Sequence, residues 1–378
     1  MRMSPQIARA LGLAAGVLAS TNGGSEALGQ SSLSVPLTFD TALVDFREAQ
    51  GLENAECGAS VLLTENYLHV GCPGPGPSGD APGMILVFRT ESGHWWLDHR
   101  IDAPIPEPGA RFGATLVRFP HGWIAIGAPG ASKGAGSVHT CAEGGAFLQT
   151  TEPIANPNPA PGDHFGASLA AADGFLLVGA PGKDTTRGVD SGEAYVFEGF
   201  QDLWDLNGIL ESSEAGPGAR LGAAVAITTT TAAVGSPFAT AAAGLDSGAV
   251  FIFPRTAGAW VSATRILASN GQQGDQFGAS LAISGDRLLV GAPRVDRFGD
   301  TDRGSLYVFQ RNQVGFWSEG PELAPSEPFA GARFGTVVSL CGARGIVGSP
   351  LHGPTGSGKA YLLEATEPSW SVGATLES

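Results

Sequence analysis

Short apolar runs recur along the chain around a polar turn, and one such stretch repeats with little change. Residues 277–293 read FGASLAISGDRLLVGAP, in which two apolar runs flank a Gly-Asp turn, with Phe-Gly at the start and Gly-Ala-Pro at the end. Related stretches begin at residues 57, 112, 165, 221 and 334, so six copies follow one another at intervals of 53 to 57 residues. Each copy predicts a β-hairpin, and the regular period predicts an array of equal units.

Each hairpin is followed by signals for two further strands. In the third copy a polar loop leads to EAYVF, and after a turn the chain continues through a stretch that contains Trp204. The other copies carry GMILVF, GSVHT, GAVFIF, GSLYVF or GKAYLL at the third-strand position. Four strands in each unit, buried between neighbouring units, predict an all-β protein, a β-propeller of four-stranded blades. We expect six blades, with seven as the alternative.

The residue types of the repeated stretch favour a structural role for it. Gly278, Ala279 and Ser280 are small, so an innermost strand can crowd the central axis, while Phe277 can fill the seam with an adjacent blade. Pro293 fixes the exit from the second strand, because proline cannot donate to the ladder. Function is therefore expected in the parts that differ between copies.

From about Cys57 to the C-terminus the chain resembles the FG-GAP repeat family, whose blades form the head propeller of integrin α subunits. Phe-Gly and Gly-Ala-Pro at fixed spacing, strands such as EAYVF and SLYVF, and the Trp that follows them carry this resemblance. It implies a propeller with ligands on one face. Integrin-type blades often hold Ca²⁺ in an Asp-rich loop between the first two strands, but here that loop is only AADG, ISGD or TTTT. No cofactor is therefore expected, and calcium lacks support at the family's usual place.

Three segments make up the predicted domain organisation. Residues 1–29 are predicted to be a signal peptide, because two arginines precede a short apolar stretch and small residues precede Gln30. Residues 30–54 resemble the mature start of an integrin α chain, and we expect a strand and linker there that can clasp the open edge of the last blade. Whether the C-terminus is complete stays open. The propeller is assigned to residues 55–378, with repeats near 55–109, 110–162, 163–218, 219–274, 275–331 and 332–378.

Charge and cysteine content narrow the class of protein. Acidic residues outnumber basic ones by 36 to 21, and the net charge of −15 repels a phosphate backbone, so nucleic acid is not an expected partner. No later segment is apolar enough to span a bilayer, so we expect a secreted or cell-surface protein, and a monomer. Cys57 and Cys72 open and close the same hairpin, which predicts a disulfide between them. Cys141 and Cys341 lie in other copies and are expected to be unpaired.

Candidate ligand-binding residues lie in the loops that vary between copies, which strand polarity places on one face of the ring. These candidates are Lys183, Asp184, Arg187, Arg294, Asp296, Arg297 and Asp300. Asp296, Asp300 and Asp302 are also weak candidates for an oxygen-ligand metal site, with no metal as the main expectation. Asp190, Asp246 and Asp302 share one repeated slot before the third strand, where a turn-capping role is the favoured interpretation.

Two functions from different classes fit these observations. The favoured hypothesis is a non-catalytic recognition module, similar to an integrin α head, that binds an extracellular protein or glycan through its loop face. No nucleophile elbow, zinc-binding helix motif, phosphate loop or Cys-x-x-Cys supports catalysis, and no catalytic residue is assigned. The alternative is a secreted polysaccharide hydrolase or lyase using carboxylates such as Asp184, Asp296 and Asp300 around the channel.

Overall fold

The computed structural model describes most of the chain from Ala55 to Glu377. The described residues are 55–74, 81–91, 94–119, 122–145, 153–200, 203–261, 263–297, 299–325, 327–366 and 369–377. The predicted signal peptide, residues 1–29, and the predicted N-terminal clasp, residues 30–54, lie outside them.

The first three blades are antiparallel sheets of four strands that follow chain order. Blade 1 contains β1 (Ser60–Leu63), β2 (Tyr67–Cys72), β3 (Met84–Glu91) and β4 (His94–Asp102). Blade 2 contains β5 (Thr115–Phe119), β6 (Trp123–Ala128), β7 (Ser137–Ala142) and the short β8 (Ile154–Ala155), with one helical turn, α2 (Ala131–Gly134), between β6 and β7. Blade 3 contains β9 (Ser168–Ala172), β10 (Phe175–Ala180), β11 (Glu193–Phe200) and β12 (Leu203–Leu210).

The last three blades repeat this plan. In blade 4 two short segments, which both pair with β15, share the place of the fourth strand. Blade 4 contains β13 (Ala224–Ile227), β14 (Thr231–Ser236), β15 (Ala249–Thr256), β16 (Ala259–Trp260) and β17 (Thr264–Ile266). Blade 5 contains β18 (Ser280–Ser284), β19 (Arg287–Ala292), β20 (Ser305–Arg311) and β21 (Trp317–Leu323). Blade 6 contains β22 (Val337–Cys341), β23 (Arg344–Ser349), β24 (Lys359–Thr366) and β25 (Ser369–Glu377).

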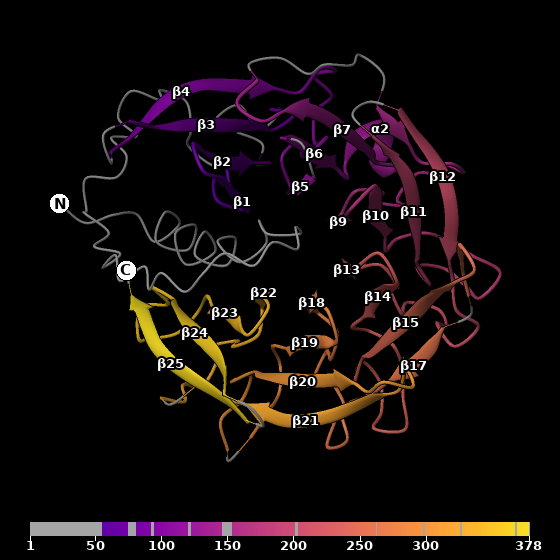
Figure 1. The fold of residues 1–378 in the computed structure, drawn as a ribbon, viewed down its shortest axis with the longest axis vertical. Coiled ribbons are helices and arrows are strands. Elements are labelled where there is room, and N and C mark those ends of the chain that lie inside the picture. Colours follow the sequence, from indigo (N-terminus) through magenta and orange to yellow (C-terminus); the bar gives the residue numbers. More distant parts are fainter. Residues whose placement is uncertain are drawn as a thin grey trace.

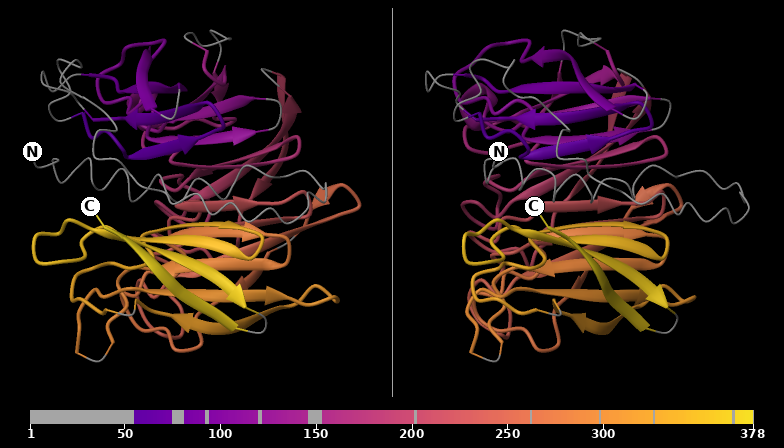
Figure 2. Two further views of the ribbon diagram at one scale, coloured as in Figure 1. Left: turned by 60° about the vertical axis from the view of Figure 1, so that its left-hand side comes forward. Right: turned by 90° about the vertical axis from the view of Figure 1, so that its left-hand side faces the viewer.

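The six sheets are arranged around a central axis, which confirms the predicted six-bladed β-propeller (Figure 1). The first strand of each blade, namely β1, β5, β9, β13, β18 or β22, lies nearest the axis, and the later strands lie successively further out. Viewed from the side, the sheets stand side by side around the ring (Figure 2). A separate apolar core fills each of the five seams between consecutive blades, from blade 1 to blade 6.

The glycines of the repeated stretch bring neighbouring blades into backbone contact. A Cβ atom on Gly291 of blade 5 would lie 2.0 Å from the carbonyl oxygen of Gly335 in blade 6. Ser280 donates a hydrogen bond of 2.7 Å to the same oxygen. Glycine is therefore required where the carbonyl of the next blade approaches. Equivalent hydroxyl to carbonyl bonds join Ser60 to Gly113, Thr115 to Gly166 and Ser168 to Gly222.

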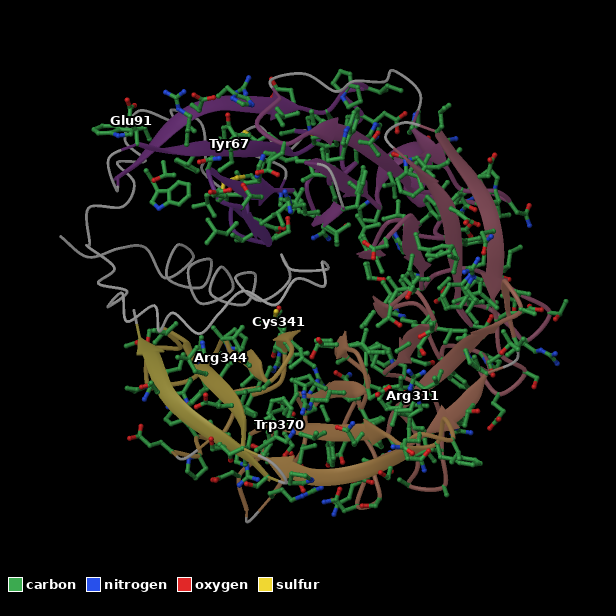
Figure 3. The ribbon with its side chains drawn as sticks, in the orientation of Figure 1. Tyr67, Glu91, Arg311, Cys341, Arg344 and Trp370 are labelled. Carbon is green, nitrogen blue, oxygen red and sulfur yellow. A yellow bond between two sulfur atoms is a disulfide. The ribbon has the colours of Figure 1, made fainter. Side chains whose placement is uncertain are left out.

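Aromatic residues fill the seams. Phe277 is 1% exposed, belongs to the core between blades 4 and 5, and pairs its backbone with Gly248 of blade 4. Its ring meets that of Tyr307 edge to face, with centroids 5.4 Å apart. Trp370 on β25 packs against the core between blades 5 and 6 (Figure 3). The Phe-Gly motif and the fourth-strand Trp are thus parts of the packing between blades.

Blade 1 begins with a disulfide where the other blades have an apolar side chain. Cys57 occupies the position of Phe277 and is joined to Cys72, with their Cα atoms 3.9 Å apart. Cys141 and Cys341 are free. Backbone bridges link each blade to the next from blade 1 to blade 6, but within the described ranges no such bridge links blade 6 to blade 1. The disulfide therefore fastens the hairpin that lacks this tie to a preceding blade.

Candidate functional site

The variable loops gather on one end of the ring, which we call the loop face. Loops between the second and third strands are hydrogen-bonded to the linkers between blades. Gly218 donates to the carbonyl of Val189, and Gly274 to that of Leu245. The loops between the second and third strands and the linkers between blades therefore form one surface.

In blade 3 the three predicted charged residues lie at different depths. Asp184 and Arg187 are exposed, and Asp184 Oδ1 accepts a hydrogen bond of 2.9 Å from the backbone of Asp190. Lys183 is 5% exposed, and its ammonium donates to the buried carboxylate of Asp163 at 3.1 Å. Asp184 and Arg187 can meet a ligand, whereas Lys183 holds the loop from beneath.

Blade 5 repeats this division. Arg294 and Asp296 are exposed, and Asp300 lies in a tight turn in which its backbone pairs with that of Arg297. The Arg297 side chain folds under the loop, where its guanidinium donates to the hydroxyl of Tyr307 at 3.3 Å and lies 3.7 Å from a carboxylate oxygen of Glu322. Arg297 is therefore mainly a packing residue, and Arg294, Asp296 and Asp300 form the surface.

The Asp slot before the third strand is a turn position. Asp190, Asp246 and Asp302 all adopt left-handed backbone conformations, with φ of 51°, 54° and 47°. The amide of Asp302 donates to Asp296 Oδ1 at 2.8 Å, just as that of Asp190 donates to Asp184. Among the described residues no group of three or more His, Cys, Asp or Glu side chains has the arrangement of a metal site. The acidic residues here order the loops.

Below the loop face, three positions in each of blades 2 to 6 meet and form what we call the socket. The first lies two residues before the Phe-Gly motif, and the third lies on the third strand opposite the Val or Ile before the Gly-Ala-Pro motif. At the second position, the loop residue accepts a hydrogen bond from the glycine before the third strand, as Lys183 does from Gly192 and Ala131 from Gly136. The sockets of successive blades are therefore equivalent in structure.

Most sockets are filled. In blade 3 Lys183 donates a hydrogen bond to Asp163, and Tyr195 donates one of 2.8 Å to Glu193. In blade 6 the third-strand ring is Tyr361, whose hydroxyl lies 3.4 Å from His352 Nδ1. The corresponding residues are Ala219, Ala239 and Phe251 in blade 4, and Asp275, Val295 and Tyr307 in blade 5, all of them buried.

The socket of blade 2 is not filled. Its residues are Ala110, Ala131 and His139, and they line a cavity of about 60 Å³. Phe112 and Ala128 complete its buried floor, whereas Pro104, Ile105 and Ser132 are exposed at its rim. The cavity exists because His139 is shorter than tyrosine and because two alanines occupy the other positions.

A few polar groups face this cavity. His139 is 6% exposed, and burial lowers the pKa of its imidazole to about 4, so the ring is neutral at physiological pH. Its Nε2 lies 3.0 Å from the hydroxyl of Ser137. At the rim, Glu107 Oε2 accepts a hydrogen bond from the amide of Ser132, which has a left-handed backbone with φ of 52°. The next residue, Lys133, has φ of 61°, so two successive non-glycine residues carry backbone strain beside the cavity.

Two carboxyl groups, one half-buried and one buried, bear on the alternative of a hydrolase. Burial raises the pKa of Glu193, against the opposing effect of the hydrogen bond from Tyr195. Burial likewise raises the pKa of Asp275. Glu193 belongs to blade 3 and Asp275 to blade 5, so they occupy separate sockets and do not flank one substrate position as a glycosidase pair does.

The loop face also exposes large apolar side chains. Between 36% and 66% of the surface of each is accessible, and they come from four different loops or linkers: Ile105, Val189, Leu245 and Phe329. Apolar groups spaced among charged ones are typical of recognition surfaces. Neither these residues nor the blade 2 socket is among the candidates predicted from the sequence. The signal for the socket was present, because GSVHT places His139 where EAYVF and SLYVF have tyrosine.

Comparisons with known proteins agree with the fold. The sequence profile of the FG-GAP repeat matches residues 152–197, 204–253 and 260–309, which are three consecutive units. No curated protein sequence matches the chain. A crystal structure of a protein from Lactobacillus plantarum has a similar fold, with a TM-score of 0.50, 15% sequence identity and 84% of each chain covered.

A search of the described residues finds no helix with the length and hydropathy to cross a membrane. The repeat profile, the six four-stranded sheets and the backbone contacts made by the Phe-Gly and Gly-Ala-Pro glycines agree with one another. Three consecutive units of the chain, between residues 152 and 309, are FG-GAP repeats, and the chain folds as a six-bladed β-propeller.

Proposed function

We propose that this protein is a secreted or cell-surface recognition module without catalytic activity, which binds an extracellular protein or glycan through its loop face. The observation that carries this proposal is the exposure of apolar side chains from four loops among charged residues of the same surface. A rigid ring holds these loops in place, so binding costs little conformational entropy.

Charged residues of blades 3 and 5, all exposed except the half-buried Asp300, supply polar contacts on the same face. Asp184 and Arg187 project from one loop, and Arg294, Asp296 and Asp300 from the equivalent loop two blades away. Both acidic and basic groups are present, which favours a partner of mixed polarity over a strongly charged polymer. The exposed Val189 lies beside the first group and provides an apolar anchor.

The proposal is tested with an array of glycans and extracellular proteins, probed with the chain from Gln30 onward in calcium and again with chelator. Changing Asp184, Arg187, Asp296 and Asp300 together to alanine is expected to abolish at least one interaction. The matched control changes Glu65, Glu91, Asp173 and Arg344 to alanine, since these residues are exposed at the opposite end of the blades and carry the same total charge. Equal binding by both variants, or no binding by the folded parent chain, would refute recognition by the loop face.

A further inference from the structure

We infer that the open socket of blade 2 is a pocket for the acetamido group of an N-acetylhexosamine. The inference rests on the proposed function and names the ligand chemistry for one part of the loop face. Blades 3, 5 and 6 fill the same position with the buried rings of Tyr195, Tyr307 and Tyr361, whereas blade 2 leaves it open.

The size of the cavity fits a small group. One water-sized group occupies roughly 10–15 Å³ of cavity volume. A cavity of about 60 Å³ therefore holds about four non-hydrogen atoms. An acetamido group has that many. A sugar ring is too large for the cavity and would remain at the rim, where Pro104 and Ile105 are exposed.

The walls match the three parts of an acetamido group. Phe112, Ala110 and Ala128 form an apolar floor suited to the methyl group. The neutral His139 and Ser137 share one hydrogen bond, which leaves a donor for the carbonyl oxygen. Glu107 uses Oε2 for the amide of Ser132, and its Oε1 has no hydrogen-bond partner within the described residues, so it can accept from the ligand N–H.

The same walls argue against other small groups. A carboxylate would meet the negative charge of Glu107, and an ammonium group would lose its hydration against an apolar floor. A plain hydroxyl would leave the floor without an apolar partner. An acetylated amino sugar is neutral and presents the amide beside an apolar sugar face, which can cover the exposed Ile105.

Ligand-observed NMR titration of the full chain tests the inference. Chitotriose, which carries acetamido groups, is compared with cellotriose, which has hydroxyl groups in their place. We expect saturable binding of chitotriose, at least tenfold tighter than any binding of cellotriose, with the largest saturation transfer to the acetamido methyl protons. Equal binding of the two sugars, or none of chitotriose, would overturn the inference.

Two variants replace residues of the blade 2 socket by those that other blades carry at the equivalent positions. His139→Tyr introduces the tyrosine of blades 3, 5 and 6, and Ala131→Val introduces the valine of blade 5. Each is expected to weaken chitotriose binding at least tenfold while leaving the circular dichroism spectrum unchanged. Arg344→Ala, at the opposite end of blade 6, is the matched control and is expected to change the affinity by less than twofold. Unchanged binding by both folded socket variants overturns the inference.

The outcomes separate this inference from the broader proposal. If chitotriose does not bind but the fourfold loop-face variant loses an array partner, recognition by the loop face stands and the acetamido pocket is wrong. A peptide with acetyl-lysine serves as a second probe, because it presents the same amide without a sugar. Binding of that peptide in the absence of chitotriose binding would also overturn the assignment to a glycan.

Discussion

Blades 2 and 3 place different residues on the same three backbone positions. In blade 3 Asp163 and Lys183 form a buried ion pair and Tyr195 is hydrogen-bonded to Glu193, whereas in blade 2 Ala110, Ala131 and His139 leave a cavity. The second and third strands pair in the same register in both blades, so that His139 lies opposite Ile126 as Tyr195 lies opposite Val178. The scaffold therefore fixes where a socket lies, and three side chains decide whether it is packing or a pocket.

The largest effect is expected from breaking the buried ion pair of blade 3. In Lys183→Ala the carboxylate of Asp163, whose side chain is 2% exposed, loses its only cationic partner within the described residues. Hydrogen bonds of 2.8 Å from Asn156 Nδ2 and from the Ala160 amide remain. Loss of one partner of a buried ion pair costs about 3–5 kcal/mol, so the free energy of unfolding from urea denaturation should fall by about that amount at most. The double variant Asp163→Ala/Lys183→Ala, which matches blade 4, should recover most of the loss. A loss below 1 kcal/mol for the single variant would mean that the pair contributes little.

Protonation of buried histidines should destabilise blades 1 and 2 and leave the blade 3 socket unchanged. Burial lowers the pKa of His139 and of His69 to about 4, from the ordinary value of 6.5. The unfolded chain therefore binds these protons first, and stability is lost as pH falls from about 6.5 to 4. Each histidine contributes up to about 3 kcal/mol to this loss. Urea midpoints at pH 7, 5 and 4 measure it.

Matched variants separate the two histidines. His69→Leu introduces the residue that blades 3 and 5 carry at that position, and both ring nitrogens of His69 lack hydrogen-bond partners within the described residues. His139→Tyr removes the other group. Each variant should reduce the acid-dependent loss, and the combined variant should remove most of it. A loss that persists undiminished in both would assign it to other groups.

Sockets in different blades can be compared only if neighbouring blades are in the same close backbone contact. Two glycine variants test the importance of this contact. In Gly291→Ala the new Cβ would meet the Gly335 carbonyl of the next blade at 2.0 Å, so the two blades must move apart. In Gly348→Ala of blade 6 the nearest atom is Cγ1 of Val337, at 2.6 Å in the same blade, and this side chain can rotate. We expect the first variant to lose about 1–3 kcal/mol in denaturant unfolding and the second clearly less. Equal losses would show that contact between blades does not explain the glycine.

Sequence alone predicts the scaffold far better than the site. The stretch from Phe277 to Gly291 has a counterpart in each of the six copies, so periodicity identifies the blades, and the exposed positions of Asp184 and Arg187 follow from the loop pattern. Lys183 and Arg187, by contrast, look alike as cations four residues apart. Only the approach of Asp163, from a different loop, separates the buried cation from the exposed one.

The cavity could not be predicted from the sequence, because it also depends on residues that are distant along the chain. His139 departs visibly from the tyrosine pattern, but a shorter ring leaves a cavity only if its neighbours are also small. Those neighbours are Ala110 and Ala131, which come from a linker and from a turn. The cavity volume depends on side chains from three separate segments, whereas the periodicity of the repeats is visible in the sequence itself.

The smallest effect is expected from closing the blade 2 socket. His139→Tyr gives blade 2 the ring found in blade 3 and fills a cavity of about 60 Å³. At about 24 cal/mol for each Å³ filled, the variant should gain about 1 kcal/mol, which corresponds to a rise in Tm of about 2 °C. Differential scanning calorimetry at pH 7 can resolve this shift, and Arg187→Ala serves as the unaffected control. A fall in Tm would mean that the tyrosine hydroxyl finds no partner and that the cavity is shaped for a smaller ring. Because tighter packing and weaker sugar binding are expected from the same substitution, a rise in Tm with loss of chitotriose binding would separate ligand recognition from stability.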